Sequence, residues 1–507
     1  MYEMLYTLLC MDSKLKTLKK RLYEIKYISS ASSLLHWDSE VYLPQNGVSS
    51  RAITNSLIDE ICHKKLLKLD DGNILTDLVN ESSNLSLEDA AMVREAFRNF
   101  DKGRKFSNSF VKRLSILSTK SHHVWIDARK KKDFSMYSKI LGEMIDIQKE
   151  AVDLLGYEDH PYNALIDDYE PGMTVSKLDT IFNGLRDFLV PFIRKITDKK
   201  VSWNITMDGK FSVLKQKKLN RDILDILGYD LSSGRLDIST HPFTVEIGPH
   251  DVRVTTRYSP NDPIYALYSS IHEGGHGIYT QGVPVEYFDV GIGHGASLGV
   301  HESQSRMYEN LLGRSLPFIK LLHGYILKYF PDFTKTPDDL YRIINHVTPG
   351  YIRTESDEVT YNLHIIIRYE IEKKLISGDI KVTELPEVWN SKMKEYLGVD
   401  VPSDDLGVLQ DVHWSLGSFG YFPTYSIGNI YSAQIYNTML KDIPELKEVI
   451  SLDTLKSMKA WLYEHIHKYG RVYMAEDLIK NATGEGMNTS YFNSYIEEKY
   501  SKLYNLV

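Results

Sequence analysis

Helical periodicity runs through most of this 507-residue chain and leaves little room for a large sheet. Apolar residues recur at the spacing of an amphipathic helix in residues 85–105, 178–196 and 361–376. Strand signals are few. The runs FTVEIG and DVRVTTRY, within residues 243–258, are rich in β-forming side chains and are separated by a Gly-Pro-His turn. We therefore expect a mainly α-helical fold with one small β-hairpin.

Composition is that of a large globular protein. Hydrophobic residues make up 42% of the chain and charged residues 25%, which is ordinary for a protein that buries a sizeable core. Length alone would suggest about three domains. However, proline, glycine and serine never cluster into a long linker, and the sequence has neither internal repeats nor low-complexity tracts. We therefore expect a single unit over residues 1–507.

Charge and cysteine content exclude several classes of protein. The formal net charge of −8 argues against a nucleic-acid-binding surface, and the short basic runs at residues 14–21 and 128–133 are typical of solvated helix faces. Cys10 and Cys62 cannot build a disulfide framework and fit a reducing compartment. No run approaches the roughly 20 apolar residues of a membrane span, and the N-terminus lacks the pattern of a signal peptide. We expect a cytoplasmic protein with no membrane or nucleic-acid partner.

The segment YALYSSIHEGGHGIYTQG contains the pattern H-E-G-G-H, formed by His272, Glu273 and His276. An α-helix turns about 100° per residue, so residues i and i+4 share a face and His272 and His276 can hold one metal ion. Glu273 then lies beside the ion, where a carboxylate can take a proton from the attacking water. The two glycines cost roughly 1 kcal/mol each relative to alanine in a helix interior, but small residues let a neighbouring element or the substrate approach closely. The alternative is a chance pair of histidines on a surface helix.

A third metal ligand is needed, because a catalytic zinc usually takes three protein ligands and leaves a fourth position open. Glu302 lies in SLGVHESQSRMYENLL, whose apolar residues suit a second helix packed against the first. A glutamate that points inward there completes a His/His/Glu site. His301 is a rival, but neighbours on a helix point about 100° apart, so only one of the two can face the ion.

The ordered set of motifs in this chain resembles that of the M32 metallocarboxypeptidases. The family carries H-P-F, D-x-R-x-T, H-E-x-x-H, H-E-S-[GQ], I-R-x-x-A-D and G-x-x-Q-D-x-H-W in this order. Ser356 replaces the usual alanine of the fifth motif, and Val41 and Leu43 depart from the usual threonine and methionine of an N-terminal segment. Besides H-E-G-G-H, the matching motifs lie at residues 241–243, 251–255, 301–304, 352–357 and 407–414, and further similar segments lie at residues 34–52, 164–174 and 419–434.

The resemblance implies a single gluzincin-like catalytic domain over residues 1–507, with two helical lobes around a deep cleft and a small β-hairpin beside the zinc helix. It implies one Zn²⁺ per chain, with Co²⁺ as a possible substitute, held by His272, His276 and Glu302, and Glu273 as the general base. It further implies a homodimer that removes single residues, with broad preference, from peptides with a free C-terminus.

Two other classes of function stay open. A dipeptidyl carboxypeptidase or an oligopeptidase could use the same zinc ligands. A helical scaffold could also retain the metal without turnover, although the intact Glu273 argues against this reading.

A carboxypeptidase must recognise the C-terminal carboxylate of its substrate, and arginine can pair with a carboxylate through two hydrogen bonds. Arg353 is the first candidate and Arg253 the second. The alternative for each is a structural salt bridge with a nearby acid such as Asp357 or Asp251. Asp357 and Glu358 are also candidates for the carboxylate that orients a metal-bound histidine.

Donors to the developing oxyanion form the last group of candidates. Related helical zinc peptidases place a histidine and a tyrosine well after the zinc motif, and the segments QDVHW and GYFPTY resemble that arrangement. His413 ranks first, Tyr425 second and Tyr421 last. His241, in H-P-F, either binds the backbone or carboxylate of the substrate or holds the predicted hairpin.

Overall fold

The computed structural model describes residues 2–201, 203, 205–207 and 209–506, and for residues 2–10 it describes the backbone alone. Helices dominate this part of the chain, with caps that follow from the local sequence. The helices are α1 (Tyr2–Val41), α2 (Val48–Leu66), α3 (Ile74–Asn80), α4 (Leu87–Lys105), α5 (Asn108–Lys131), α6 (Ser135–Leu155), α7 (Tyr162–Ile166), α8 (Val175–Asp198), α9 (Val213–Leu227), α10 (Pro263–Gly282), α11 (Val285–Asp289), α12 (Leu298–Arg306), α13 (Leu316–Tyr329), α14 (Pro337–Ile344), α15 (Tyr361–Ser377), α16 (Leu385–Leu397), α17 (His413–Leu416), α18 (Pro423–Asp442), α19 (Leu452–His465), α20 (Ala475–Thr483) and α21 (Ser490–Tyr504).

The three strands of the described chain are β1 (Gly234–Ile238), β2 (Thr244–Gly248) and β3 (Asp251–Thr256). They form one sheet in the order β1-β3-β2, with β1 parallel and β2 antiparallel to β3. The predicted hairpin is confirmed as β2 and β3. The first strand was not predicted, because a five-residue parallel partner that is half exposed leaves no local pairing signal in the sequence.

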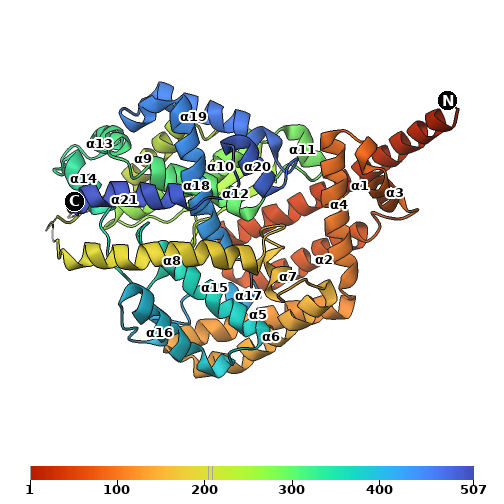
Figure 1. The fold of residues 1–507 in the computed structure, drawn as a ribbon, viewed down its shortest axis with the longest axis horizontal. Coiled ribbons are helices and arrows are strands. Elements are labelled where there is room, and N and C mark those ends of the chain that lie inside the picture. Colours follow the sequence, from red (N-terminus) through yellow and green to blue (C-terminus); the bar gives the residue numbers. More distant parts are fainter. Residues whose placement is uncertain (1, 202, 204, 208, 507) are drawn as a thin grey trace.

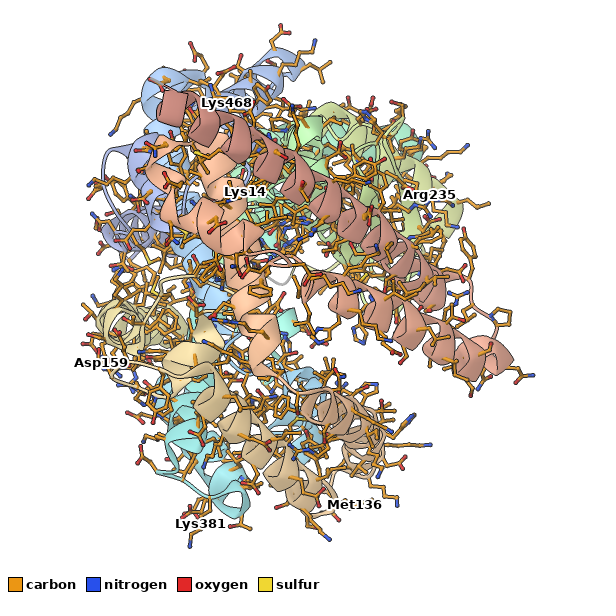
Figure 2. All side chains as sticks on the ribbon, turned by 90° about the vertical axis from the view of Figure 1, so that its right-hand side faces the viewer. Lys14, Met136, Asp159, Arg235, Lys381 and Lys468 are labelled. Atoms are coloured by element: carbon orange, nitrogen blue, oxygen red, sulfur yellow. The ribbon has the colours of Figure 1, made fainter. Side chains whose placement is uncertain are left out.

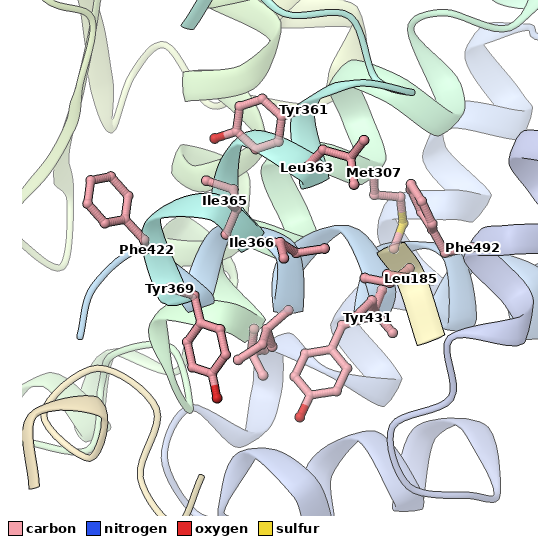
Figure 3. Close-up of a cluster of buried hydrophobic side chains, with 14 of the residues drawn as sticks. Leu185, Met307, Tyr361, Leu363, Ile365, Ile366, Tyr369, Phe422, Tyr431 and Phe492 are labelled. Atoms are coloured by element: carbon pink, nitrogen blue, oxygen red, sulfur yellow. The ribbon is translucent and has the colours of Figure 1, made fainter. Parts of the chain in front are cut away.

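The mainly helical fold is confirmed, and its core surrounds α18. This helix buries side chains on all its faces, as expected of a helix enclosed by others. It packs against α12, α15, α20 and α21, and Figure 1 shows it running through the middle of the molecule. Figure 3 shows part of the surrounding core, where apolar side chains from α8, α15, α18 and α21 meet.

An N-terminal pair of helices lies on one side of the molecule. Figure 2 looks onto this side, where α1 and α2 lie in front and Arg235 of β1 lies close to the end of α1. Contacts with the sheet hold α1 in place: the Arg253 guanidinium lies 4.1 Å from the centre of the Trp37 ring, and the Tyr42 hydroxyl donates to Asp237 Oδ1 at 3.1 Å. Helix α1 is therefore attached directly to the sheet, and α2 packs against α1.

Among the helices of the described residues, none combines the length and the low charge that a membrane span requires. Of the two cysteines, Cys62 is a free thiol, and the side chain of Cys10 lies outside the described residues.

Candidate metal centre

Helices α10 and α12 bring the three predicted metal ligands together. Asp262 caps α10 by accepting hydrogen bonds from the first backbone amides, and Pro263 occupies the first turn, where its missing N–H costs nothing. His272 and His276 then lie one turn apart. Their Nε2 atoms stand 3.8 and 3.4 Å from Oε2 of Glu302 on α12. Candidate ligand atoms of all three residues lie within 4.8 Å of one another, which fits a single ion.

Glycines allow α10 and α12 to approach so closely. The helix runs unbroken through Gly274 and Gly275, and a Cβ atom added to Gly275 would stand 2.7 Å from Cα of Ser305 on α12. A Cβ atom added to Gly274 would collide with Leu224 of α9. At Gly275 the cost in helix propensity is therefore offset by a close approach of α10 to the backbone of α12 that no larger residue permits.

Glu309 holds the ring of His272 in place. Its Oε2 lies 2.8 Å from Nδ1 of His272, which leaves Nε2 of that ring directed at the site. Glu309 lies in a π-helical turn, η3 (Met307–Leu312), directly after α12. Arg306 bridges the two acids: its Nε donates to Oε1 of Glu302 at 2.6 Å and its Nη1 to Oε2 of Glu309 at 3.2 Å.

Glu309 was not predicted for this role, for which Asp357 and Glu358 were the candidates in the sequence. Asp357 instead accepts hydrogen bonds from nearby backbone amides, including those of Val359 and Thr360. Glu358 pairs with Lys499 and with two tyrosines. One sequence signal could have identified Glu309: it lies seven residues after Glu302, and this spacing places both acids on the same face of a helix.

Both carboxylates of the site are anionic at neutral pH. Burial alone would raise the pKa of Glu302, but the charge of Arg306, with that of His272 and His276, holds it well below its ordinary value. Burial likewise opposes ionisation of Glu309, and Arg306 together with the hydrogen bond from His272 lowers its pKa to about 2. Two imidazole nitrogens and one carboxylate oxygen fit a divalent metal ion chemically.

The predicted rival ligand, His301, faces away from the common ligand position. Its Nδ1 lies 2.6 Å from Nδ1 of His276, on the side of that ring opposite Glu302, and its Nε2 lies 3.3 Å from the Thr280 hydroxyl. Burial holds the pKa of His301 well below its ordinary value, so its ring is neutral.

Glu273 is buried on the face of α10 that meets the sheet. Its side chain is 7% exposed, and its Oε2 accepts a hydrogen bond from the Thr244 hydroxyl at 2.7 Å. It lies next to His272 in the chain but outside the group of three ligands, as a residue one position along a helix must.

Arg353 is buried, and its acidic partner is Asp411, which was not among the predicted partners. Its Nε and Nη2 lie 3.0 and 2.9 Å from Oδ1 of Asp411, and its Nη1 donates to the Tyr361 hydroxyl at 3.1 Å. Asp411, in the last M32-like motif, also pairs with Arg368, which is fully buried. Tyr361 connects this group to the predicted metal ligands, because the guanidinium of Arg306, which donates to Glu302, lies 4.3 Å from the centre of its ring.

His413, Tyr421 and Tyr425 lie together beside Arg353. Nε2 of His413 stands 3.3 Å from the Tyr425 hydroxyl, and the two tyrosine rings are 5.3 Å apart. Burial lowers the pKa of His413 to about 3, so its ring is neutral. Burial raises the pKa of Tyr421 to about 12, with the charge of Glu302 acting in the same direction. This aromatic group therefore adjoins Arg353, whose guanidinium lies 4.9 Å from the centre of the Tyr425 ring.

Arg253 and His241 lie apart from the predicted metal ligands. Arg253 pairs with Asp251 through two contacts of 2.7 Å, the salt bridge named as its alternative. The side chain of His241 is exposed, in the turn between β1 and β2. Within the described residues, neither side chain contacts His272, His276 or Glu302.

Comparison with known proteins points to one family. The sequence profile described as "Carboxypeptidase Taq (M32) metallopeptidase" matches residues 17–500. The chain is 39% identical to Carboxypeptidase 1 of Bacillus subtilis, over 96% of this chain and 97% of that protein. It is 34% identical to Thermostable carboxypeptidase 1 of Thermus thermophilus, over 95% and 97%. The structure is similar to that of Pyrococcus furiosus carboxypeptidase, with a TM-score of 0.92 and 36% identity over 96% of this chain and 99% of that one.

Proposed function

Because the chain belongs to the M32 metallopeptidase family and is therefore a metallocarboxypeptidase, we propose that it uses zinc and releases single amino acids from free peptide C-termini. The grouping of His272, His276 and Glu302 carries this proposal. Two imidazoles and one carboxylate are a common ligand set of catalytic zinc, and the same set accepts cobalt. When bound, the ion polarises the scissile carbonyl and acidifies the attacking water.

Glu273 is the proposed general base. Its carboxylate accepts a proton from the attacking water and then delivers it to the nitrogen of the leaving amino acid. Its burial supports this role, because few waters compete for the carboxylate in such a site.

Arg353 is the proposed receptor for the substrate carboxylate. A guanidinium carries five N–H groups, and the contacts with Asp411 and Tyr361 use three of them. One N–H on each terminal nitrogen is left, a pair that matches the two oxygens of a carboxylate. Asp411 is also shared between Arg353 and Arg368, so one positive charge of this buried group is left for the substrate to balance.

His413, Tyr425 and Tyr421 are the proposed donors to the developing oxyanion. The neutral state of His413 and the raised pKa of Tyr421 keep both groups as hydrogen-bond donors at neutral pH. For Arg253 and His241 we propose supporting roles at the sheet, where Arg253 joins β3 to Trp37 of α1.

We further propose a single domain, a homodimer and a cytoplasmic location. One hydrophobic core extends from α5 to α21, and a smaller one joins α1, α3 and α4, which supports one folded unit. The family resemblance supports the homodimer, which light scattering coupled to gel filtration can measure. The low cysteine content supports a reducing compartment.

Peptides with free and with amidated C-termini test the proposed function. Time courses followed by mass spectrometry should show single residues leaving free peptides in the presence of zinc, and amidated peptides should be poor substrates because they lack the charge that Arg353 pairs. Loss of two residues at a time would indicate a dipeptidyl carboxypeptidase. Equal cleavage of both peptides would indicate an oligopeptidase.

Two arginine variants sharpen the test. Arg353→Ala should lower kcat/KM steeply for peptides with a free C-terminus. For amidated peptides kcat/KM should change little, since they have no terminal carboxylate to pair with Arg353. Arg253→Ala should preserve the discrimination between free and amidated peptides. The reverse result would assign carboxylate recognition to Arg253.

A further inference from the structure

Thr244, the first residue of β2, contacts the proposed base directly. Its Oγ1 lies 2.7 Å from Oε2 of Glu273 and 3.0 Å from the backbone carbonyl oxygen of the same residue. Within the described part of the chain, no other side chain hydrogen-bonds the Glu273 carboxylate. We propose that Thr244 is a positioning residue that holds Oε2 of Glu273 and directs Oε1 toward the attacking water. This inference rests on the proposed function of Glu273.

The sheet fixes the position of the Thr244 hydroxyl. Strand β2 pairs with β3, and Thr244 lies opposite Val254. Strand β3 in turn contacts α10, because the Thr256 hydroxyl donates to the Ala266 carbonyl oxygen at 3.0 Å. Alternate residues of a strand face the same side, so Glu246 shares the face of Thr244. Glu246 is held there by an ion pair of 3.3 Å with Lys26 of α1. The strand is therefore anchored by β3 through backbone pairing and by α1 through the ion pair of Glu246.

A single hydroxyl can support both protonation states of the base. A threonine hydroxyl has one hydrogen to donate. While Glu273 is ionised, donation to Oε2 limits rotation of the carboxylate and leaves Oε1 free to take a proton from the attacking water. After that transfer, Oε1 carries the proton that will pass to the leaving amine. The hydroxyl then has two acceptors, Oε2 and the carbonyl oxygen, within reach. The proton of Thr244 itself is never transferred.

The test compares Thr244→Val, which keeps the shape of the side chain, with Thr244→Ser, which keeps the hydroxyl. Loss of a hydrogen bond to a charged group should lower kcat of Thr244→Val about 10- to 100-fold. KM should stay within about threefold of wild type, because Thr244 acts on the base and not on ground-state binding. Thr244→Ser should recover most of kcat. Zinc content, measured by elemental analysis, should equal that of wild type in both variants.

Thr256→Val is the matched control. It removes another hydroxyl that joins the sheet to α10, at a distance from Glu273, so its kcat should stay close to that of wild type. The inference is wrong if Thr244→Val keeps wild-type kcat, if Thr244→Ser is as slow as Thr244→Val, or if Thr244→Val loses zinc. Glu273→Gln is measured in parallel. If Glu273→Gln is active, the proposed function of Glu273 is wrong. If Glu273→Gln is inactive and Thr244→Val has the kcat of wild type, only the proposed role of Thr244 is wrong.

Discussion

Gly428 on α18 lies directly behind Glu302, and a Cβ atom added to Gly428 would stand 2.6 Å from Cβ of that glutamate. The backbone carbonyl carbon of Glu302 would lie 3.0 Å away, so rotation of the glutamate side chain cannot relieve the collision. Gly428→Ala should therefore displace Glu302 from the two histidines. We expect the affinity for zinc to fall at least about tenfold, as it does when the supports of a metal ligand are altered. Titration of the metal-free protein against a chromophoric chelator measures this change.

Gly324→Ala controls for the general effect of adding a methyl group to a helix. Gly324 lies in α13, and a Cβ atom there would meet no heavy atom within 4 Å. This variant should bind zinc as wild type does and gain slightly in stability. Wild-type zinc affinity in Gly428→Ala would contradict the close packing of α18 against α12.

Glu309→Gln should weaken metal binding without removing a ligand. The amide keeps the shape of the side chain but loses the charge that holds His272 and Arg306, and altered support of this kind typically costs 10- to 100-fold in metal affinity. Glu358→Gln is the matched control, since it neutralises another buried acid that pairs with Lys499 instead of a ligand. Competition with a chelator should show weaker zinc binding only for Glu309→Gln. Equal losses in both variants would point to a general effect on folding.

The parts of the site that the sequence predicted are those governed by local geometry. The shared face of His272 and His276 follows from the turn of one helix, and the inward direction of Glu302 follows from the pattern of the next helix. The approach of α12 to α10 depends instead on Gly275 and Gly428, whose neighbours lie on other helices. No local pattern reveals which element a glycine will face.

Glu309 and Asp411 were not predicted as partners of His272 and Arg353, because each acid lies far from its partner in the sequence. Glu309 is 37 residues from His272 in the sequence, and Asp411 is 58 residues from Arg353. Each acid was one of many that could have paired with its partner, and only the packing of separate helices selects between them. Asp357 lies nearer to Arg353 in the sequence, within the same motif. However, its carboxylate accepts hydrogen bonds from backbone amides of its own turn.

Asp411→Asn should both destabilise the protein and weaken the carboxylate recognition that we propose for Arg353. The substitution leaves the buried guanidinium groups of Arg353 and Arg368 facing each other without a counter-charge. Breaking a buried ion pair in this way costs about 3–5 kcal/mol. Denaturant unfolding measures the loss, and the ratio of kcat/KM for free and amidated peptides should fall because Arg353 is no longer held. A normal ratio in a destabilised protein would mean that Asp411 has a structural role only.

Glu170 should make the stability of the protein depend on pH. Glu170 is 1% exposed. Its Oε2 accepts a hydrogen bond of 2.9 Å from the backbone amide of Gly299, near the start of α12, the helix that carries Glu302. Burial raises the pKa of Glu170 from an ordinary 4.5 to about 7.

The folded protein therefore keeps a proton on the Glu170 carboxyl group at pH values where the unfolded chain has released it. The stability that this proton contributes is present in full below pH 4.5 and is lost as the pH rises through about 7.

Glu170→Gln isolates this contribution, because glutamine has a similar shape and does not titrate. The free energy of unfolding of wild type, minus that of Glu170→Gln, should decrease by roughly 2–3 kcal/mol between pH 4.5 and pH 8. Denaturant unfolding at a series of pH values, with the same zinc concentration for both proteins, gives the difference directly. Other titrating groups are common to the two proteins and cancel. Two stability curves that run parallel across this range would show that Glu170 has the same pKa in the folded and unfolded states, which a fully buried carboxylate with so few hydrogen bonds should not have.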